Sequence, residues 1–405
     1  MILALLLAAG GCDRLAARRV VVATSWPAAE RERMVEEFVR WLAAGSGAGD
    51  GARGPIAIDW LVLDPGDDRE QLAKRRDAPD VLFGGSSLDF ERLAASGRLA
   101  PLPQVESSTW AVVRRGEVRV EESPRVGAGT APVDDRTEVA FDDPRIDPVS
   151  MAWAEGPLFG SAFAEGYARL VRAAGCRRGV GSRTGAAAAA VARGEADRAP
   201  VVMFDRGSST ASRPDQVPWL EGVAILRTGL NRAAAVAFVR FLASEGRLVP
   251  APGPDGRASL AARELMADLL GATLVDAQDE LREAWVVLER NGSPAKELRW
   301  MTEPPPWPPA SVAKLLAPQD EAAMRLVEDL AGQVAPDAGA RAWLVRSWLS
   351  PARSIDRDLL EELARAADGA LVREPRFREW LRAEWTAWAR QRYRRVSRVV
   401  AGSRS

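Results

Sequence analysis

The stretch RVVVATSWPAAERERMVEEFVRWL, residues 19–42, decides the fold. Its valines at 20–22 form a continuous apolar run, which is typical of a strand buried on both faces of a parallel sheet. Pro27 suits the first turn of a helix, where its missing N–H costs nothing. Apolar residues then recur at helical spacing as far as Leu42, with Glu and Arg between them. The stretch therefore predicts a strand that leads directly into an amphipathic helix.

Thr24, Ser25 and Trp26 stand at the junction of these two elements. The junction lies at the carboxyl end of the strand, which is where ligands bind in open α/β sheets. The unpaired N–H groups of a helix N-terminus also attract anions. The three residues are therefore expected to contact a ligand. The alternative is that Ser25 only caps the helix, and nothing local decides between the two.

The bulk composition excludes several classes of function. The chain has 405 residues, enough for two or three domains, and its net charge of -1 gives no field that favours nucleic acid. Histidine is absent, which excludes Ser-His-Asp and Cys-His catalysis and histidine metal ligands. The two cysteines, Cys12 and Cys176, cannot form a Cys-rich zinc site. We expect no cofactor and no metal.

The first residues, MILALLLAAGGC, indicate the compartment. This apolar run is too short to span a bilayer as a helix, and it is typical of a signal peptide. Ala9-Gly10-Gly11-Cys12 resembles a bacterial lipobox, in which the cysteine is lipidated after cleavage. We therefore expect residues 1–12 to be a lipoprotein signal peptide up to the anchor Cys12. A plain cleaved signal and an uncleaved anchor are the alternatives.

Further along, predicted strands and helices alternate. Ile56–Leu63 and Pro79–Ser87 read as strands, separated by a polar helix and followed by a short one, so the order is βαβαβα with a parallel sheet. Residues 110–123 read as a β-hairpin that turns near Arg115-Gly116. Val149–Trp153 reads as the strand of a second α/β unit. From Ala310 onward, apolar residues follow a helical period.

Four stretches together resemble a known family. They are VVVATSW before a helix, APDVLFGGSSLDFERLAASGRLAPL, FAEGYARLVRAAG followed by VARGEAD, and EGVAILRTGLNRAAAVAFVRFLASEG. In this order, over residues 19–260, they resemble the extracellular solute-binding proteins of ABC importers, type 2 topology, closest to the iron(III)-type group. The resemblance does not extend into the remaining residues.

The resemblance implies a two-lobed α/β fold, periplasmic-binding-protein-like. The helical period of the later residues predicts that an all-helical C-terminal region follows it. Lobe one would comprise residues 19–105 and 226–260, and lobe two residues 106–225. Residues 261–309 would be a linker with a Pro-rich segment, and residues 310–405 the helical C-terminal region.

The resemblance also implies a ligand cleft between two lobes that close by a hinge motion. The residues expected at the cleft are Thr24, Ser25, Trp26, Gly84, Gly85, Ser86 and Ser87 from lobe one, and Arg183, Thr184, Gly185, Asp205 and Arg206 from lobe two. Gly84–Ser87 could instead be a tight strand-to-helix turn, and Trp26 could be core.

Iron(III) binders of this family use a pair of adjacent tyrosines. The only tyrosines here, Tyr167 and Tyr393, have no tyrosine neighbour in the sequence. A small polar or anionic solute is therefore expected rather than iron(III). The pairs Asp142-Asp143 and Asp134-Asp135 lie in loops and read as solvated turn residues, with acid/base or cation sites as the alternative.

The resulting hypothesis is a lipid-anchored substrate-binding protein on the periplasmic side of the bacterial cell envelope. It would capture a small solute for an ABC importer and its permease, without catalysis and without binding nucleic acid. One alternative is a solute-binding-like envelope module that docks a partner protein through its helical C-terminal region. The other is a carboxylate-using envelope hydrolase. The basic end ARQRYRRVSRVV reads as a solvated helix face, with contact to anionic lipid headgroups as the alternative.

Overall fold

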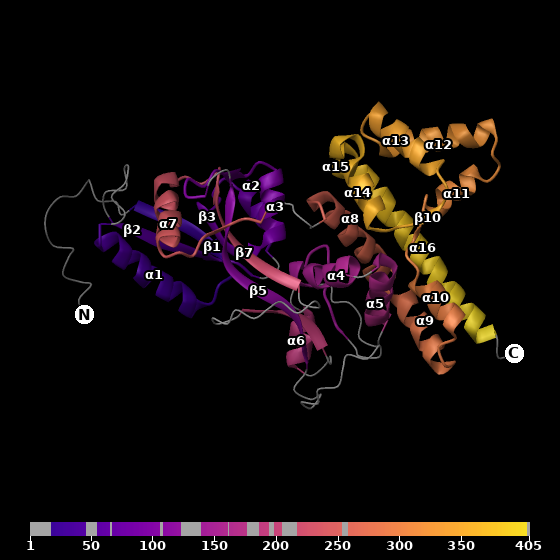
Figure 1. The fold of residues 1–405 in the computed structure, drawn as a ribbon, viewed down its shortest axis with the longest axis horizontal. Helices are drawn as coiled ribbons and strands as arrows, with labels where there is room; N and C mark the ends of the chain where they lie inside the picture. The colour runs from indigo at the N-terminus through magenta and orange to yellow at the C-terminus, as the bar shows by residue number, and fades with distance from the viewer. Residues whose placement is uncertain are drawn as a thin grey trace. The chain divides into compact units, whose positions relative to one another are not determined.

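The computed structural model describes residues 18–45, 55–64, 67–105, 108–122, 139–160, 162–175, 186–193, 198–204, 217–252 and 258–402. The chain forms two compact units, which are considered separately (Figure 1). The first unit consists of Met1–Arg115 and Leu220–Gly253, and the second of Gly116–Trp219 and Pro254–Ser405.

The first unit is built on a twisted mixed sheet. Strand β1 (Arg18–Thr24) pairs in parallel with β2 (Ile56–Val62) on one side and with β3 (Val81–Ser86) on the other. The next strand, β7 (Val217–Leu226), is antiparallel to β3. Two short strands pair with longer ones. Strand β4 (Leu99–Ala100) is antiparallel to β7, and β8 (Val249–Pro250) is antiparallel to the long strand β5 (Trp110–Glu122).

Helices cover both faces of this sheet. On one face, α1 (Ala28–Ala43) and α7 (Arg232–Ser244) bury aromatic side chains, among them Phe38 and Phe238, against the valines of β1. On the other face, α2 (Arg69–Lys74) and α3 (Ser87–Ala95) pack with Ala23 and Leu82. The sheet is thus buried on both sides, as the valine run predicts, and the α/β class is confirmed.

Strand β5 corrects the expected hairpin near Arg115-Gly116. The chain does not turn there, because residues Trp110–Glu122 form one strand, β5. Its second half pairs with β6 (Arg198–Met203), with Glu117 opposite Met203. Gly116 is needed for this close pairing and not for a turn, because a Cβ on it would lie 2.6 Å from the Met203 carbonyl oxygen.

Residues Val149–Trp153 are helical rather than a strand. They belong to α4 (Pro148–Gly160). The carboxylate of Asp147 accepts a hydrogen bond from the Ser150 N–H at 2.7 Å, so the Asp-Pro pair at 147–148 begins a helix in the usual way. Nearby helices of the second unit are α5 (Phe163–Gly175) and α6 (Ala186–Ala192).

The remainder of the second unit is helical, as expected, apart from two short paired strands, and its helices begin before residue 310. The expected linker at 261–309 is largely helical, because leucines such as Leu265, Leu269 and Leu281 recur at helical spacing and are fully buried. The elements are α8 (Leu260–Leu270), the π-helical η1 (Gly271–Val275), α9 (Gln278–Arg290), α10 (Ala295–Thr302), β9 (Pro306–Trp307), α11 (Ala310–Leu316), α12 (Glu321–Val334), α13 (Ala338–Trp348), β10 (Arg353–Ser354), α14 (Arg357–Arg365), η2 (Ala366–Gly369), α15 (Ala370–Arg373) and α16 (Pro375–Gly402).

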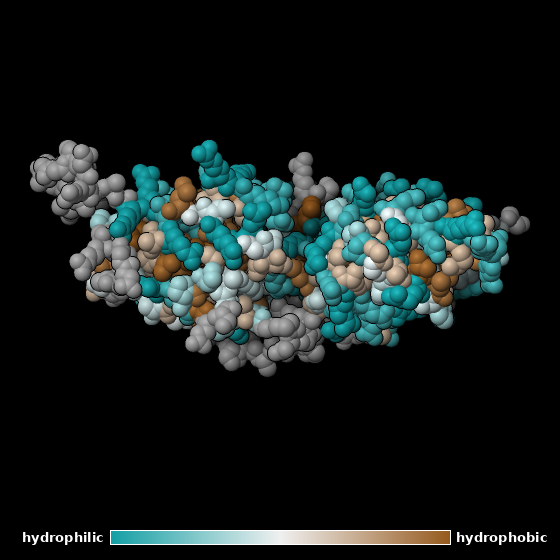
Figure 2. Space-filling view, turned by 90° about the horizontal axis from the view of Figure 1, so that it is seen from above, coloured by the Kyte–Doolittle hydropathy of each residue, from teal (hydrophilic) through white to brown (hydrophobic). Residues whose placement is uncertain are grey.

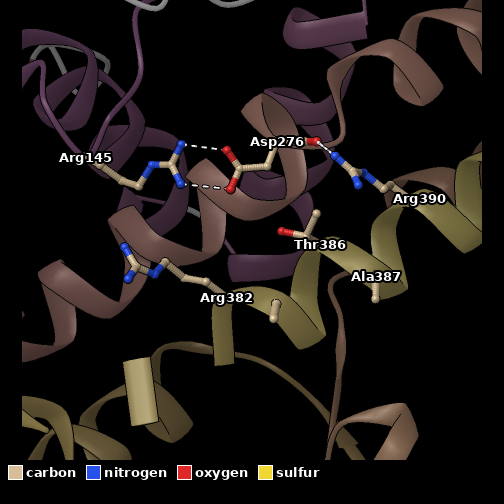
Figure 3. A pocket seen from close by; sticks show the side chains of 7 residues that line it. Arg145, Asp276, Arg382, Thr386, Ala387 and Arg390 are labelled. Atoms are coloured by element: carbon tan, nitrogen blue, oxygen red, sulfur yellow. Dashed lines mark hydrogen bonds and ion pairs between the residues drawn. The ribbon is translucent and has the colours of Figure 1, made fainter. Parts of the chain in front are cut away.

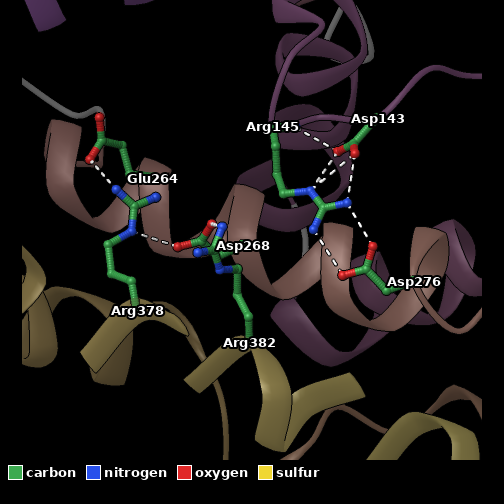
Figure 4. A network of polar contacts seen from close by, with 7 residues as sticks. All are labelled: Asp143, Arg145, Glu264, Asp268, Asp276, Arg378 and Arg382. Atoms are coloured by element: carbon green, nitrogen blue, oxygen red, sulfur yellow. Dashed lines mark hydrogen bonds and ion pairs between the residues drawn. The ribbon is translucent and has the colours of Figure 1, made fainter. Parts of the chain in front are cut away.

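Helix α16 is held beside α8, η1 and α9 by a ladder of ion pairs (Figure 4). Acidic and basic partners lie 114 positions apart in the sequence, so the helices run in parallel. In the ion pairs of the ladder, the acidic residues are Glu264, Asp268 and Glu280, and the basic residues are Arg378, Arg382, Arg390 and Arg394. Arg390 also donates a hydrogen bond to the backbone carbonyl of Asp276. With the same spacing of 114 positions, Ala272 corresponds to Thr386. Neither residue is charged, so one rung of the ladder, an ion pair, is missing at this level.

Candidate functional site

The expected ligand residues of the first unit lie at the carboxyl ends of β1 and β3. Thr24, the last residue of β1, is fully buried, and its Oγ1 accepts a hydrogen bond from the Trp26 N–H at 3.1 Å. Ser25 is exposed, and its hydroxyl makes no hydrogen bond to the described residues. The N-cap of α1 is Pro27, without a side-chain cap, so Ser25 is not the helix cap.

The Trp26 indole is half-buried and fixed on several sides. Its Nε1–H donates to Oε2 of Glu221 at 2.9 Å. Its ring packs on Phe83, with 4.3 Å between ring centroids, and the Arg114 guanidinium carbon lies 5.3 Å from the ring centroid. Arg114 is itself held by Glu30 at 3.2 Å. Trp26 therefore packs against the core and remains partly exposed.

Gly84 and Gly85 have a backbone that only glycine adopts easily, with φ of +82° and +102°. A Cβ on Gly84 would lie 2.8 Å from the Trp26 Nε1, and a Cβ on Gly85 would lie 2.7 Å from the Arg69 Nε. The two glycines thus let Trp26 and Arg69 approach the end of β3. This close approach is the reason for the Gly-Gly pair.

Ser86 and Ser87 are almost wholly buried. The Ser86 Oγ accepts from the Asp89 N–H at 3.2 Å and donates to the Asp89 carboxylate at 2.9 Å, which forms a capping box at the start of α3. The hydrogen-bonding groups of Ser86 are therefore used inside the protein. In this structure the tight-turn interpretation fits Ser86 better than direct ligand contact.

Sequence analysis missed two charged residues that complete this cluster, Glu221 and Arg69. Both side chains are 8% exposed, and Arg69 Nη1 lies 3.4 Å from the Asp89 carboxylate. A signal for Glu221 was present, because a single carboxylate interrupts the apolar strand VPWLEGVAIL. Arg69 gave no comparable signal, since arginine is common throughout the chain.

Burial raises the pKa of Glu221 from its ordinary value of 4.5 to about 7, against the opposing effects of Arg114 and the Trp26 hydrogen bond. The folded state therefore keeps this proton up to about pH 7, whereas the unfolded chain releases it near pH 4.5. The free energy of unfolding should fall as the pH rises through this window.

We expect Glu221→Gln to weaken this pH dependence, because glutamine has no proton to release. The test compares denaturation midpoints of parent and variant at about pH 5 and about pH 8. The exposed Glu245→Gln in the same unit is the matched control. A Glu221→Gln variant with the parent's full pH dependence would contradict the assigned cause.

The site residues expected from the second lobe, Arg183, Thr184, Gly185, Asp205 and Arg206, lie outside the described residues, as does Cys12. The neighbouring acidic pair is described and differs from expectation. Asp142 and Asp143 are buried, not solvated. The Asp142 carboxylate accepts from the Ala187 N–H at 3.1 Å, and Asp143 forms an ion pair with Arg145 at 2.7 Å. Asp142 joins its loop to the start of α6, and Asp143 holds the neighbouring Arg145, which in turn binds Asp276, so both carboxylates have structural roles.

A hollow of about 420 Å³ lies beside the missing rung of the ladder (Figure 3). Three guanidinium groups line it, but each already has an acceptor. Arg145 binds Asp276 through two hydrogen bonds of 2.8 Å, Arg390 donates to the Asp276 carbonyl at 2.6 Å, and Arg382 lies 3.8 Å from Asp268. Because each guanidinium group is engaged within the protein, this hollow is a part of the helix packing.

The two tyrosines, distant in sequence, are neighbours in the second unit. Both are fully buried, and the Tyr393 hydroxyl donates to the Thr273 carbonyl oxygen at 3.2 Å. Burial raises the pKa of Tyr167 to about 12, so the phenolate that binds iron(III) is disfavoured there. Among the described residues, no group of three or more Cys, Asp or Glu side chains could hold a metal ion.

No helix in the described part of the chain is long and apolar enough to cross a membrane. On the face seen in Figure 2, hydrophobic side chains form small separate patches among hydrophilic ones.

No family model matches the sequence, and no curated protein matches it. Solved structures do match. Iron-bound HitA from Pseudomonas aeruginosa is 17% identical over 57% of this chain and 82% of its own, with a TM-score of 0.40. The periplasmic binding protein AfuA from Actinobacillus pleuropneumoniae is 15% identical over 56% and 80%, with a TM-score of 0.44. A periplasmic thiamin binding protein is 13% identical over 59% and 86%, with a TM-score of 0.40.

Proposed function

We propose that the first unit binds a small polar or anionic solute at the carboxyl ends of β1 and β3. The chain would deliver this solute to the permease of an ABC importer. The observation that carries the proposal is the arrangement of three features at one edge of the sheet. These are the exposed Ser25 hydroxyl, the fixed indole of Trp26, and the backbone at Gly84–Gly85.

Elementary chemistry supports a ligand at this edge. The carboxyl ends of parallel strands are where open α/β sheets bind ligands. Ser25 offers a hydroxyl without a hydrogen-bond partner among the described residues, and the first N–H groups of α1 follow it directly. The partly exposed Trp26 indole adds an apolar surface. The Arg114 guanidinium over its ring adds a positively charged group. The sequence alone supports further ligand contacts by Arg183, Thr184, Gly185, Asp205 and Arg206.

Binding without catalysis is favoured over the hydrolase alternative by the carboxylates of the site. A glycan-acting hydrolase needs two carboxylates that face the substrate. Here Glu221 accepts from Trp26, Glu30 pairs with Arg114, and Asp89 caps α3. Each of these carboxylates is already engaged by a donor from the protein.

Ser25→Ala tests the proposal. A screen of small polar solutes for those that raise the thermal stability of the parent protein supplies a ligand, since a ligand that binds only the native state stabilises it. We expect Ser25→Ala to weaken the affinity for that solute, measured by calorimetry, by roughly 0.5–1.5 kcal/mol, because one hydrogen bond is lost. Ser244→Ala, in the last turn of α7, is the control. Unchanged affinity in Ser25→Ala would remove this residue from the site.

We also propose that Cys12 carries a lipid that anchors the protein on the periplasmic side of the bacterial envelope. The small residues before Cys12 support this proposal. Cys12→Ala should then release the protein from the membrane fraction of expressing cells. Retention of the variant in that fraction would contradict a lipid anchor.

A further inference from the structure

The last turns of α16 carry a strong excess of positive charge. From Trp385 to the end of the chain there are six arginines, at 390, 392, 394, 395, 398 and 404, and no Asp, Glu or Lys. Helix α10 packs beside this part of α16. It adds Lys296, Arg299 and Trp300.

Indole rings lie between these cations. Two cations lie over the Trp300 ring. The Lys296 Nζ is 4.9 Å from the ring centroid, and so is the Arg395 Cζ. The Arg392 guanidinium carbon lies 5.0 Å from the centroid of the Trp388 ring. A hollow of about 200 Å³ is lined by Trp300, Glu303, Arg392, Arg395 and Val396.

Several of these cations are neutralised within the protein. Glu280 pairs with Arg394 at 2.5 Å and with Arg390 at 3.7 Å, and Glu303 pairs with Arg392 at 2.5 Å. Lys296, Arg395 and Arg398, in contrast, have no carboxylate partner among the described residues. Three positive charges therefore remain uncompensated in one area, which also exposes 40% of Val399.

We infer that this basic–aromatic surface, formed by Lys296, Trp300, Trp388, Arg392, Arg395 and Arg398, binds the headgroups of anionic phospholipids. Guanidinium groups bind phosphate oxygens in pairs, which gives geometric fit as well as charge attraction. Tryptophan and basic side chains are the residues that favour a membrane–water interface. An exposed valine among the arginines suits a headgroup region better than a purely ionic partner. The inference does not depend on the proposed solute or on the lipid anchor.

The test is sedimentation of the full chain with lipid vesicles. Cys12→Ala is used throughout so that an attached lipid cannot contribute. One set of vesicles contains equal amounts of phosphatidylglycerol and phosphatidylcholine, and the other contains phosphatidylcholine only. Binding is expected only to the anionic vesicles, and it should weaken as salt is added.

Charge reversal locates the surface. Arg395→Glu/Arg398→Glu should bind anionic vesicles at least about tenfold more weakly, because each basic residue near such a surface contributes to binding. The matched control is Arg325→Glu/Arg341→Glu, which makes the same change in net charge at exposed positions on α12 and α13. This control should bind as the parent does. Lys296→Glu, on the separate helix α10, should also weaken binding, so the test does not depend on the folding of one variant.

Three outcomes would overturn the inference. The first is equal binding to neutral and anionic vesicles. The second is an equal loss in the control variant, which would mean that only net charge matters. The third is tighter binding to a single-stranded DNA oligonucleotide than to anionic vesicles at the same salt concentration, which would point to nucleic acid instead.

Discussion

Asp80→Ala should lower the free energy of unfolding by roughly 2–5 kcal/mol, because several buried donors lose their acceptor together. The Asp80 carboxylate is 1% exposed and joins three parts of the first unit. It accepts from the Val21 N–H at 2.8 Å, from the Asn231 N–H at 2.7 Å and from the Asn231 amide at 3.1 Å. It therefore fixes β1 and the start of α7 against β3.

Differential scanning calorimetry of parent and variant measures this effect. The control is Asp77→Ala, because Asp77 is exposed and only three residues away. We expect this control to lie within about 0.5 kcal/mol of the parent. An Asp80→Ala variant as stable as the control would contradict the claim that the carboxylate holds β1 and the start of α7 in place.

Trp26→Ala should weaken solute affinity by roughly 2–4 kcal/mol, the effect of removing an aromatic anchor from a desolvated site. The change removes the contact surface of the indole and leaves the buried Glu221 carboxyl without its donor at 2.9 Å. It also frees Arg114 from the ring. Calorimetry with the solute from the stability screen measures the loss.

Two further variants distinguish the loss of the Trp26 contacts from the loss of any half-buried tryptophan. Trp26→Phe keeps an aromatic ring but cannot donate to Glu221, so an intermediate loss of affinity is expected. Trp343→Ala removes a half-buried tryptophan from α13 and should leave affinity unchanged. If Trp26→Ala folds and binds the solute as well as Trp343→Ala does, the indole is core packing only.

Local sequence signals were sufficient for the elements that position the site. The valine run, Pro27 and the amphipathic spacing predict β1 and α1, and the structure has both. The Gly-Gly pair predicts a turn at the end of the third strand, whereas Gly84 and Gly85 lie within β3, at an irregularity in its pairing with β7, and both have positive φ. The role of Ser86 could also be read locally, since an acidic residue follows it three positions later in the manner of a capping box.

Contacts between distant segments could not be predicted from one sequence. Glu221 reaches Trp26 across 195 positions, and Arg114 reaches Glu30 across 84. The ion-pair ladder depends on a register between helices 114 positions apart. Asp142 looks like a loop residue because its partner Ala187 lies 45 positions away, and the Arg145 beside Asp143 reaches Asp276 only in the fold.

Hydrogen–deuterium exchange with and without the solute from the screen tests the central claim most directly, because it locates the bound ligand. The account predicts slower exchange in peptides that cover Thr24–Trp26 and Gly84–Ser87, with no change in peptides from α11 to α16. Protection confined to those C-terminal helices, with none at the ends of β1 and β3, would contradict it.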